Sequence, residues 1–159
     1  MVQLGDVFEV PISKERKGYV QFVTTDSCEL NSDVIRVFSK RYHVSDTPNL
    51  KDIVDGDIDS FYHVYLKVGV KTNVWHKIGN VPVEEAFEAP YFRSSEDYGN
   101  PDVRVSQNWF VWRTTDSSPR YVGKLSEKYQ SYHLGGVWPP EAIQEVLETG
   151  KLSWFYPGY

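Results

Sequence analysis

The fold is decided near the start of the sequence, where Val7-Phe8-Glu9-Val10-Pro11-Ile12 is followed by Gly18-Tyr19-Val20-Gln21-Phe22-Val23. Phe8, Val10 and Ile12 occupy alternate positions, so a β-strand places them on one face. The second stretch is rich in β-branched and aromatic residues, which also favour strands. A polar connection of about five residues separates the two, a length typical of a β-hairpin. The sequence therefore predicts that the chain begins with two antiparallel strands.

Further strand-like segments follow along the chain. The clearest alternation runs from Tyr62 to Val70, where apolar side chains occupy every second position, and it predicts one continuous strand. Shorter extended segments are predicted at 33–42, 74–79, 103–113 and 120–124. The stretches 45–59 and 84–101 combine Pro and Gly with many acidic residues, so they are predicted to be long connections.

One helix is predicted near the end of the chain. Pro139-Pro140-Glu141 opens a segment with an apolar stripe, and Gly150 follows its last turn, a pattern typical of a capped amphipathic helix. The aromatic tail 152–159 is expected to pack back as an edge strand. Together these segments predict a mostly β (α+β) fold, a twisted antiparallel sheet or partly open barrel of about six to eight strands with one C-terminal helix. A chain of 159 residues is expected to form a single domain over 1–159.

Composition excludes several functional classes. With a net charge of −5 and no long run of Lys and Arg, the chain is not expected to bind nucleic acid directly, whereas a basic protein partner complements its charge. Cys28 is the only cysteine, which excludes an intrachain disulfide and favours a reducing compartment. No signal-peptide pattern and no apolar run of membrane-spanning length occur, so a cytoplasmic protein without membrane contact is expected.

The sequence contains no recognisable catalytic motif. No two of its four histidines are spaced as a helical metal-binding pair. Cys28 is not in a catalytic motif, and Gly135-Gly136 lacks the Lys-Ser/Thr of a phosphate-binding loop. The 55–59 run of alternating Asp does not match a calcium loop, because Tyr62 stands where the closing Glu is required. We therefore expect no enzyme, no cofactor and no metal.

The acidic residues concentrate in the two predicted connections. If these connections meet at one end of the sheet, they form a negative surface for a basic partner, with aromatic side chains as anchors. The alternative is that both are ordinary solvated loops. The residues predicted to bind the partner are Asp55, Asp57, Asp59, Glu84, Glu85, Glu88, Asp97 and Tyr98.

Two motifs resemble those of a known family. They are Gly5-Asp6-Val7-Phe8-Glu9-Val10-Pro11-Ile12 followed by Gly18-Tyr19-Val20-Gln21, and Trp75-His76-Lys77-Ile78-Gly79-Asn80-Val81-Pro82 running on to Pro90-Tyr91-Phe92. Both are similar to motifs of the immunity protein 26 family of bacterial polymorphic toxin systems. The resemblance implies a mostly β immunity protein that binds and neutralises a cognate toxin, with a basic nuclease as one candidate. It points to no catalytic residue, since the motif glycines suit turns and the apolar residues suit a core.

Two other functions stay open at this point. A ligand- or carbohydrate-binding β module would use Trp109, Trp112 or the tail aromatics as a stacking platform. A metal-dependent enzyme would assemble its site from distant residues such as His63, His76 and an Asp of the 55–59 loop.

Overall fold

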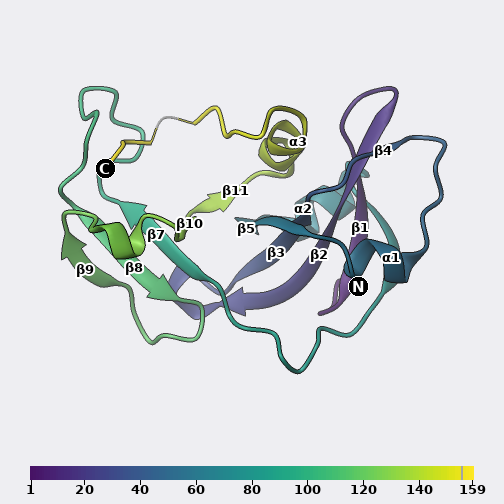
Figure 1. Cartoon of the computed structure of the whole chain (residues 1–159), viewed down its shortest axis with the longest axis horizontal. Helices are drawn as coiled ribbons and strands as arrows, with labels where there is room; N and C mark the ends of the chain where they lie inside the picture. The colour runs from purple at the N-terminus through teal and green to yellow at the C-terminus, as the bar shows by residue number, and fades with distance from the viewer. Residues whose placement is uncertain (155) are drawn as a thin grey trace.

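The computed structural model describes residues 1–154 and 156–159. Within these residues the chain forms a seven-stranded and a four-stranded sheet, with the helices beside the larger one (Figure 1). The larger sheet has the order β11-β5-β3-β2-β1-β6, with β4 beside β2, and the smaller has the order β10-β7-β8-β9. Neither sheet closes into a barrel among the described strands. The mostly β fold class with a C-terminal helix is confirmed, although the strands divide into two sheets.

The elements have the following bounds. The strands of the larger sheet are β1 (Asp6–Pro11), β2 (Arg16–Asp26), β3 (Ser32–Phe38), β4 (Tyr42–His43), β5 (Ile58–Val64), β6 (His76–Asn80) and β11 (Val137–Trp138). Those of the smaller sheet are β7 (Tyr91–Ser95), β8 (Trp109–Arg113), β9 (Arg120–Gly123) and β10 (His133–Leu134). The helices are α1 (Leu50–Val54), α2 (Leu66–Lys71) and α3 (Pro140–Thr149), with 3-10 turns η1 (Ser27–Glu29) and η2 (Glu127–Tyr129).

The predicted hairpin is confirmed as β1 and β2, which pair antiparallel with Phe8 opposite Val20. Both of these side chains are fully buried on one face of the larger sheet. Val7 and Tyr19 are buried on the opposite face. Because both faces of this central pair are covered, apolar residues occupy consecutive positions there instead of alternating with polar ones.

Different elements cover the two faces of the larger sheet. On one face, α3 packs Ile143 and Leu147 into the cluster that contains Phe8. On the other face, α1 packs Ile53 against Tyr19 and Phe38. A third cluster joins the sheets on this second face, and it contains Val23, Val34, Phe92 and Trp112. The smaller sheet is therefore attached to the face that α3 leaves open.

The prediction of one strand from Tyr62 to Val70 is wrong in its second half. β5 ends at Val64, and α2 begins at Leu66. Leu66 and Val70 pack against the core while Val68 is 48% exposed, as expected because residues four apart share one face of a helix. Residues four apart share one face in a β-strand, whose period is two, and also in an α-helix, whose period is 3.6. The local pattern of apolar residues therefore did not distinguish a strand from a helix here.

The boundaries of three other segments also differ from prediction. The connection predicted at 84–101 contains β7, in which Phe92 is fully buried and is followed by Arg93 and Ser94. One buried apolar residue among polar ones gives little alternation, and so this strand was missed. The strand predicted at 103–113 begins only at Trp109. The connection at 45–59 is confirmed in part, since α1 and the first residues of β5 lie within it.

The C-terminal helix is confirmed. α3 runs from Pro140 to Thr149, and Gly150 after it adopts the left-handed conformation (φ 77°) that favours glycine at this position. The predicted edge strand of the tail is reduced to one bridge between Gly158 and Val105, and the part of that prediction that falls on Phe155 lies outside the described residues. No helix in the described ranges combines the length and the apolar character that crossing a membrane requires.

Candidate partner-binding surfaces

The acidic residues of the first connection lie at the end of α1 and the start of β5. Asp55, Asp57 and Asp59 are all exposed. Asp55 pairs with Lys51 one helical turn earlier, and Asp59 lies 3.9 Å from the guanidinium of Arg41. The pair of Lys51 and Asp55 is exposed and contributes little to stability. Asp59 is 47% exposed beside the largely buried Arg41, so the carboxylates remain accessible to a partner.

Glu84 lies on the same face of the larger sheet as α1 and is bound to that sheet by Arg36. Its carboxylate accepts two hydrogen bonds from Arg36, at 2.8 and 3.1 Å. Nε of Arg36 donates to Gln21 at 2.9 Å, and Gln21 donates to the carbonyl of Val81 at 2.8 Å. The pKa of Glu84 is lowered because Arg36 stabilises its charged form. This network holds the segment that precedes Glu85 and Glu88, which are both exposed.

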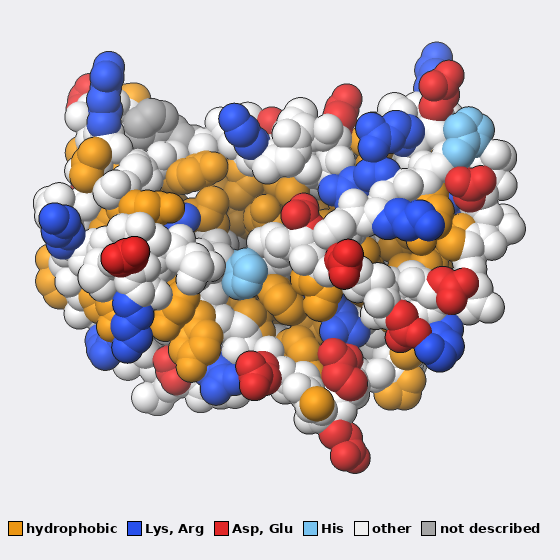
Figure 2. Space-filling view, in the orientation of Figure 1, with side chains coloured by type: hydrophobic (Ala, Val, Ile, Leu, Met, Phe, Trp, Pro, Cys, Tyr) orange, Lys and Arg blue, Asp and Glu red, His pale blue; other side chains and the backbone are white. Residues whose placement is uncertain are grey.

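The two acidic segments meet through β3. Arg36 and Phe38 are two residues apart on this strand and point to the same face, and the Arg36 guanidinium lies 5.6 Å from the centre of the Phe38 ring. Arg36 binds Glu84, and Phe38 packs against Ile53 of α1. Glu84 and α1 are therefore held by neighbouring residues on one face of β3. Acidic side chains are spread over the right-hand and lower parts of the face in Figure 2, with Lys and Arg among them.

Replacing Glu84 with alanine should lower the free energy of unfolding by about 1–2 kcal/mol, because it leaves the buried guanidinium of Arg36 without its carboxylate. The loss is limited because the Glu84 side chain is itself 51% exposed. Glu85→Ala is the matched control, since Glu85 is an exposed neighbour outside every ion pair of the described residues. Urea unfolding measures the free energy of unfolding of both variants. Equal stabilities would show that the ion pair of Arg36 and Glu84 does not stabilise the fold.

Two predicted partner-binding residues lie elsewhere. Asp97 and Tyr98 follow β7, at the opposite end of that strand from Glu88. Asp97 accepts hydrogen bonds from Ser106 and Asn108, at 2.5 and 3.3 Å. The Tyr98 ring packs edge-on against Trp109, and burial raises the pKa of its hydroxyl. Both side chains thus have internal contacts, and the structure does not bring them to the acidic surface at α1.

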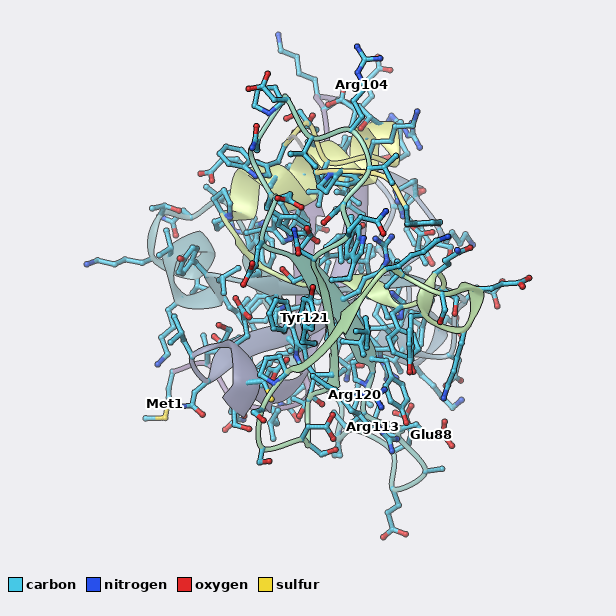
Figure 3. All side chains as sticks on the ribbon, turned by 90° about the vertical axis from the view of Figure 1, so that its left-hand side faces the viewer. Met1, Glu88, Arg104, Arg113, Arg120 and Tyr121 are labelled. Atoms are coloured by element: carbon cyan, nitrogen blue, oxygen red, sulfur yellow. The ribbon has the colours of Figure 1, made fainter. Side chains whose placement is uncertain are left out.

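The smaller sheet carries a second surface, which the sequence did not reveal. Arg113 lies over the ring of Tyr91 at 5.1 Å, and Tyr91 stacks on Tyr132 at 4.8 Å. Tyr132 contacts Tyr129 at 5.4 Å, and Arg120 lies over Tyr129 at 5.6 Å. Figure 3 shows Arg113 and Arg120 on the side of the molecule that this sheet faces. The alternating Arg and Tyr side chains come from four separate segments, so only their tertiary arrangement identifies the row.

The enzyme hypothesis placed His63 near His76 and the 55–59 loop, but the structure separates them. His63 is fully buried, and its Nε2–H donates to Asp26 at 2.7 Å, whereas His76 is exposed on β6. Among the described residues, no three His, Cys, Asp or Glu side chains are placed to hold a metal ion. The thiol of Cys28 donates to the carbonyl of Asp116, and burial together with nearby Asp26 raises its pKa, which disfavours the nucleophilic thiolate.

Asp26 is the centre of a buried cluster that sequence analysis missed. Its carboxylate accepts hydrogen bonds from Nε2 of His63 and Nε1 of Trp112, each at 2.7 Å, and from the backbone of Cys28 at 2.9 Å. Burial alone raises the pKa of Asp26, but these donors outweigh it and the pKa lies below its ordinary value. Trp112 is 3% exposed and Trp109 fully buried, so neither belongs to a ligand-stacking platform. The cluster is structural, because it joins β2 and β5 of one sheet to β8 of the other.

Comparison with known proteins finds a family match. A family model described as Immunity protein 26 matches residues 3–104 of the 159-residue chain. The matched part contains β1 to β7, and hence α1, Arg36 and the 84–88 segment. No curated protein and no solved structure matches the chain. The family match covers well over half of the chain and includes both motifs on which the resemblance rests. The chain belongs to the immunity protein 26 family.

Proposed function

We propose that this chain binds a cognate toxin protein and neutralises it, without catalysing a reaction. Membership of the immunity protein 26 family is the observation that carries the proposal. The chemistry of the described residues supports it, since the buried His63 and the protonated Cys28 thiol are engaged in structural contacts. Inhibition by an immunity protein needs a surface that occludes the toxin, and no reacting group. We place this encounter in the cytoplasm, where a single free cysteine stays reduced.

The surface that we propose for the toxin is the acidic one formed by α1, the start of β5 and the 84–88 segment. It contains six of the predicted residues, Asp55, Asp57, Asp59, Glu84, Glu85 and Glu88. An exposed cluster of carboxylates accelerates association with a basic protein and selects against acidic ones. A basic toxin, such as a nuclease, fits this surface. The clamp between Arg36 and Glu84 fixes the backbone beneath the carboxylates, which reduces the ordering cost of binding.

Binding and protection test the function first. The toxin-like protein encoded beside the gene for this chain is the partner to use. The chain should form a complex with that protein in a pull-down and rescue cells that express it. Absence of a complex at micromolar concentration, together with absence of rescue, would overturn the proposed function.

Charge reversal then tests the surface. The triple variant Asp57→Lys, Glu85→Lys and Glu88→Lys should weaken toxin binding about tenfold or more and reduce its dependence on salt. The three residues are exposed and belong to no ion pair within the described part of the chain, so folding should be unaffected. The control variant Glu15→Lys, Glu127→Lys and Glu148→Lys changes the net charge equally at exposed positions elsewhere. If both variants lose affinity to the same extent, the interface lies outside the acidic surface.

A further inference from the structure

The structure contains an apolar cavity between α3 and the loop that follows β7. Its volume is about 530 Å³, within the range of small-molecule sites. Figure 2 shows apolar side chains gathered in a hollow in the upper middle of this face. The cavity is lined by Tyr98, Gly136, Val137, Trp138, Pro139, Glu141, Ala142, Glu145, Leu152, Ser153 and Trp154. We propose that it binds a small organic cation that has an apolar body.

Trp138 gives the cavity a preformed wall. This side chain lines the cavity and is only 8% exposed. The backbone of Trp138 is fixed, because its carbonyl accepts from Tyr65 at 3.0 Å and β11 pairs with β5. The ring is therefore held in place before a ligand binds.

The requirement for a positive charge comes from Glu141 and Glu145. They lie one turn apart on α3, and they are the only charged side chains among the described residues that line the cavity. Glu145 is partly engaged, since it accepts a hydrogen bond from Ser153 at 2.9 Å. The helix N-terminus nearby carries a partial positive charge of about half a unit, which two full carboxylates exceed. The cavity therefore attracts cations and repels anions.

Aromatic walls favour the same class of ligand. Tyr98, Trp138 and Trp154 line the cavity, and the faces of aromatic rings attract cations while their surfaces accommodate an apolar body. No Lys or Arg belongs to the described lining that would compete for these rings. An apolar amine satisfies both features together, the rings and the carboxylates.

Three probes that share a phenol ring and differ in charge test the proposal. Tyramine is a cation with a phenolic oxygen, 4-methylphenol is neutral, and 4-hydroxyphenylacetate is an anion. Isothermal titration at millimolar probe should give the tightest binding for tyramine, weaker binding for 4-methylphenol and none for 4-hydroxyphenylacetate. Tyramine should also raise the melting temperature of the full chain, because a ligand that binds only the native state stabilises it. Equal binding of the anion, or no binding of any probe, would overturn the proposal.

Variants locate the binding in the cavity. Glu141→Gln combined with Glu145→Gln should weaken tyramine about tenfold and leave 4-methylphenol unchanged. Glu148→Gln is the matched control, since Glu148 is exposed on the same helix and does not line the cavity. Loss of tyramine binding in Glu148→Gln would point to a general effect of charge and against the cavity. These measurements involve no toxin, so their outcome is independent of the proposed immunity function.

Discussion

Replacing Asp26 with alanine should lower the free energy of unfolding by about 3–5 kcal/mol, because several buried groups lose their common partner at once. His63 and Trp112 come from different sheets, and both donate to this one carboxylate at 2.7 Å. All three side chains are at most 3% exposed, so water cannot replace the missing acceptor without opening the junction between the sheets. Urea unfolding followed by tryptophan fluorescence measures the loss.

The carboxylate also makes stability depend on pH. The folded pKa of Asp26 lies below its ordinary value, so its contribution is fully present above the unfolded pKa of about 4. That contribution is lost as the pH falls from there through the folded pKa, because protonation removes the charge that the donors stabilise. Asp26→Asn should therefore show a flatter dependence of unfolding free energy on pH below about 4 than the parent chain.

Asp33 is the matched control for Asp26. It lies on the neighbouring strand, at the register position beside the pair formed by Asp26 and Ser32. It is half-buried, and burial raises its pKa, so its charge does not favour folding. Asp33→Asn should leave the chain at least as stable as the parent near neutral pH. A loss in Asp33→Asn equal to that in Asp26→Asn would show that the buried cluster is not the cause.

Replacing Gly5 with alanine should cost about 2–5 kcal/mol, because a steric clash adds to backbone strain. Gly5 has φ of +89°, in the region that L-residues avoid, and a Cβ there would lie 2.5 Å from the carbonyl oxygen of Val81. That oxygen belongs to the backbone and accepts a hydrogen bond from Gln21 at 2.8 Å, so it cannot move away freely. The family motif that begins at Gly5 thus has a physical basis in this close approach.

Gly150 serves to separate the cost of backbone strain from the cost of the steric clash. It has φ of +77°, yet nothing lies within 4 Å of where its Cβ would be. Gly150→Ala should therefore cost only the backbone strain, about 1–2 kcal/mol. The melting temperatures of both variants provide the test. If Gly5→Ala is no more destabilising than Gly150→Ala, the contact with Val81 does not constrain the fold.

The candidate surface was predictable in part. The acidic residues could be identified by type and spacing, and the structure holds α1 and Glu84 on one face of the larger sheet. Asp59 lies beside Arg41, which also donates to the carbonyl of Leu147 in α3. Asp97 and Tyr98 could not be separated from the other predicted residues, because β7 was missed. This strand lies between Glu88, which precedes its start, and Asp97 and Tyr98, which follow its end. The row of Arg and Tyr side chains on the smaller sheet gave no signal, since Tyr91 and Tyr132 are distant in sequence and meet only by stacking.

By itself the sequence determined those helices and strands whose own residues are sufficient to predict them. The hairpin of β1 and β2 follows from strand-forming residues on both sides of a short polar turn, and α3 follows from its apolar stripe between Pro140 and Gly150. Only the tertiary structure decided where β5 gives way to α2, how α1 and Glu84 come to lie on one face of the larger sheet, and that Asp26 joins the two sheets. The physical reason is that these features depend on contacts between residues far apart in the chain, whose pairing is set by strand order and packing and not by local preference.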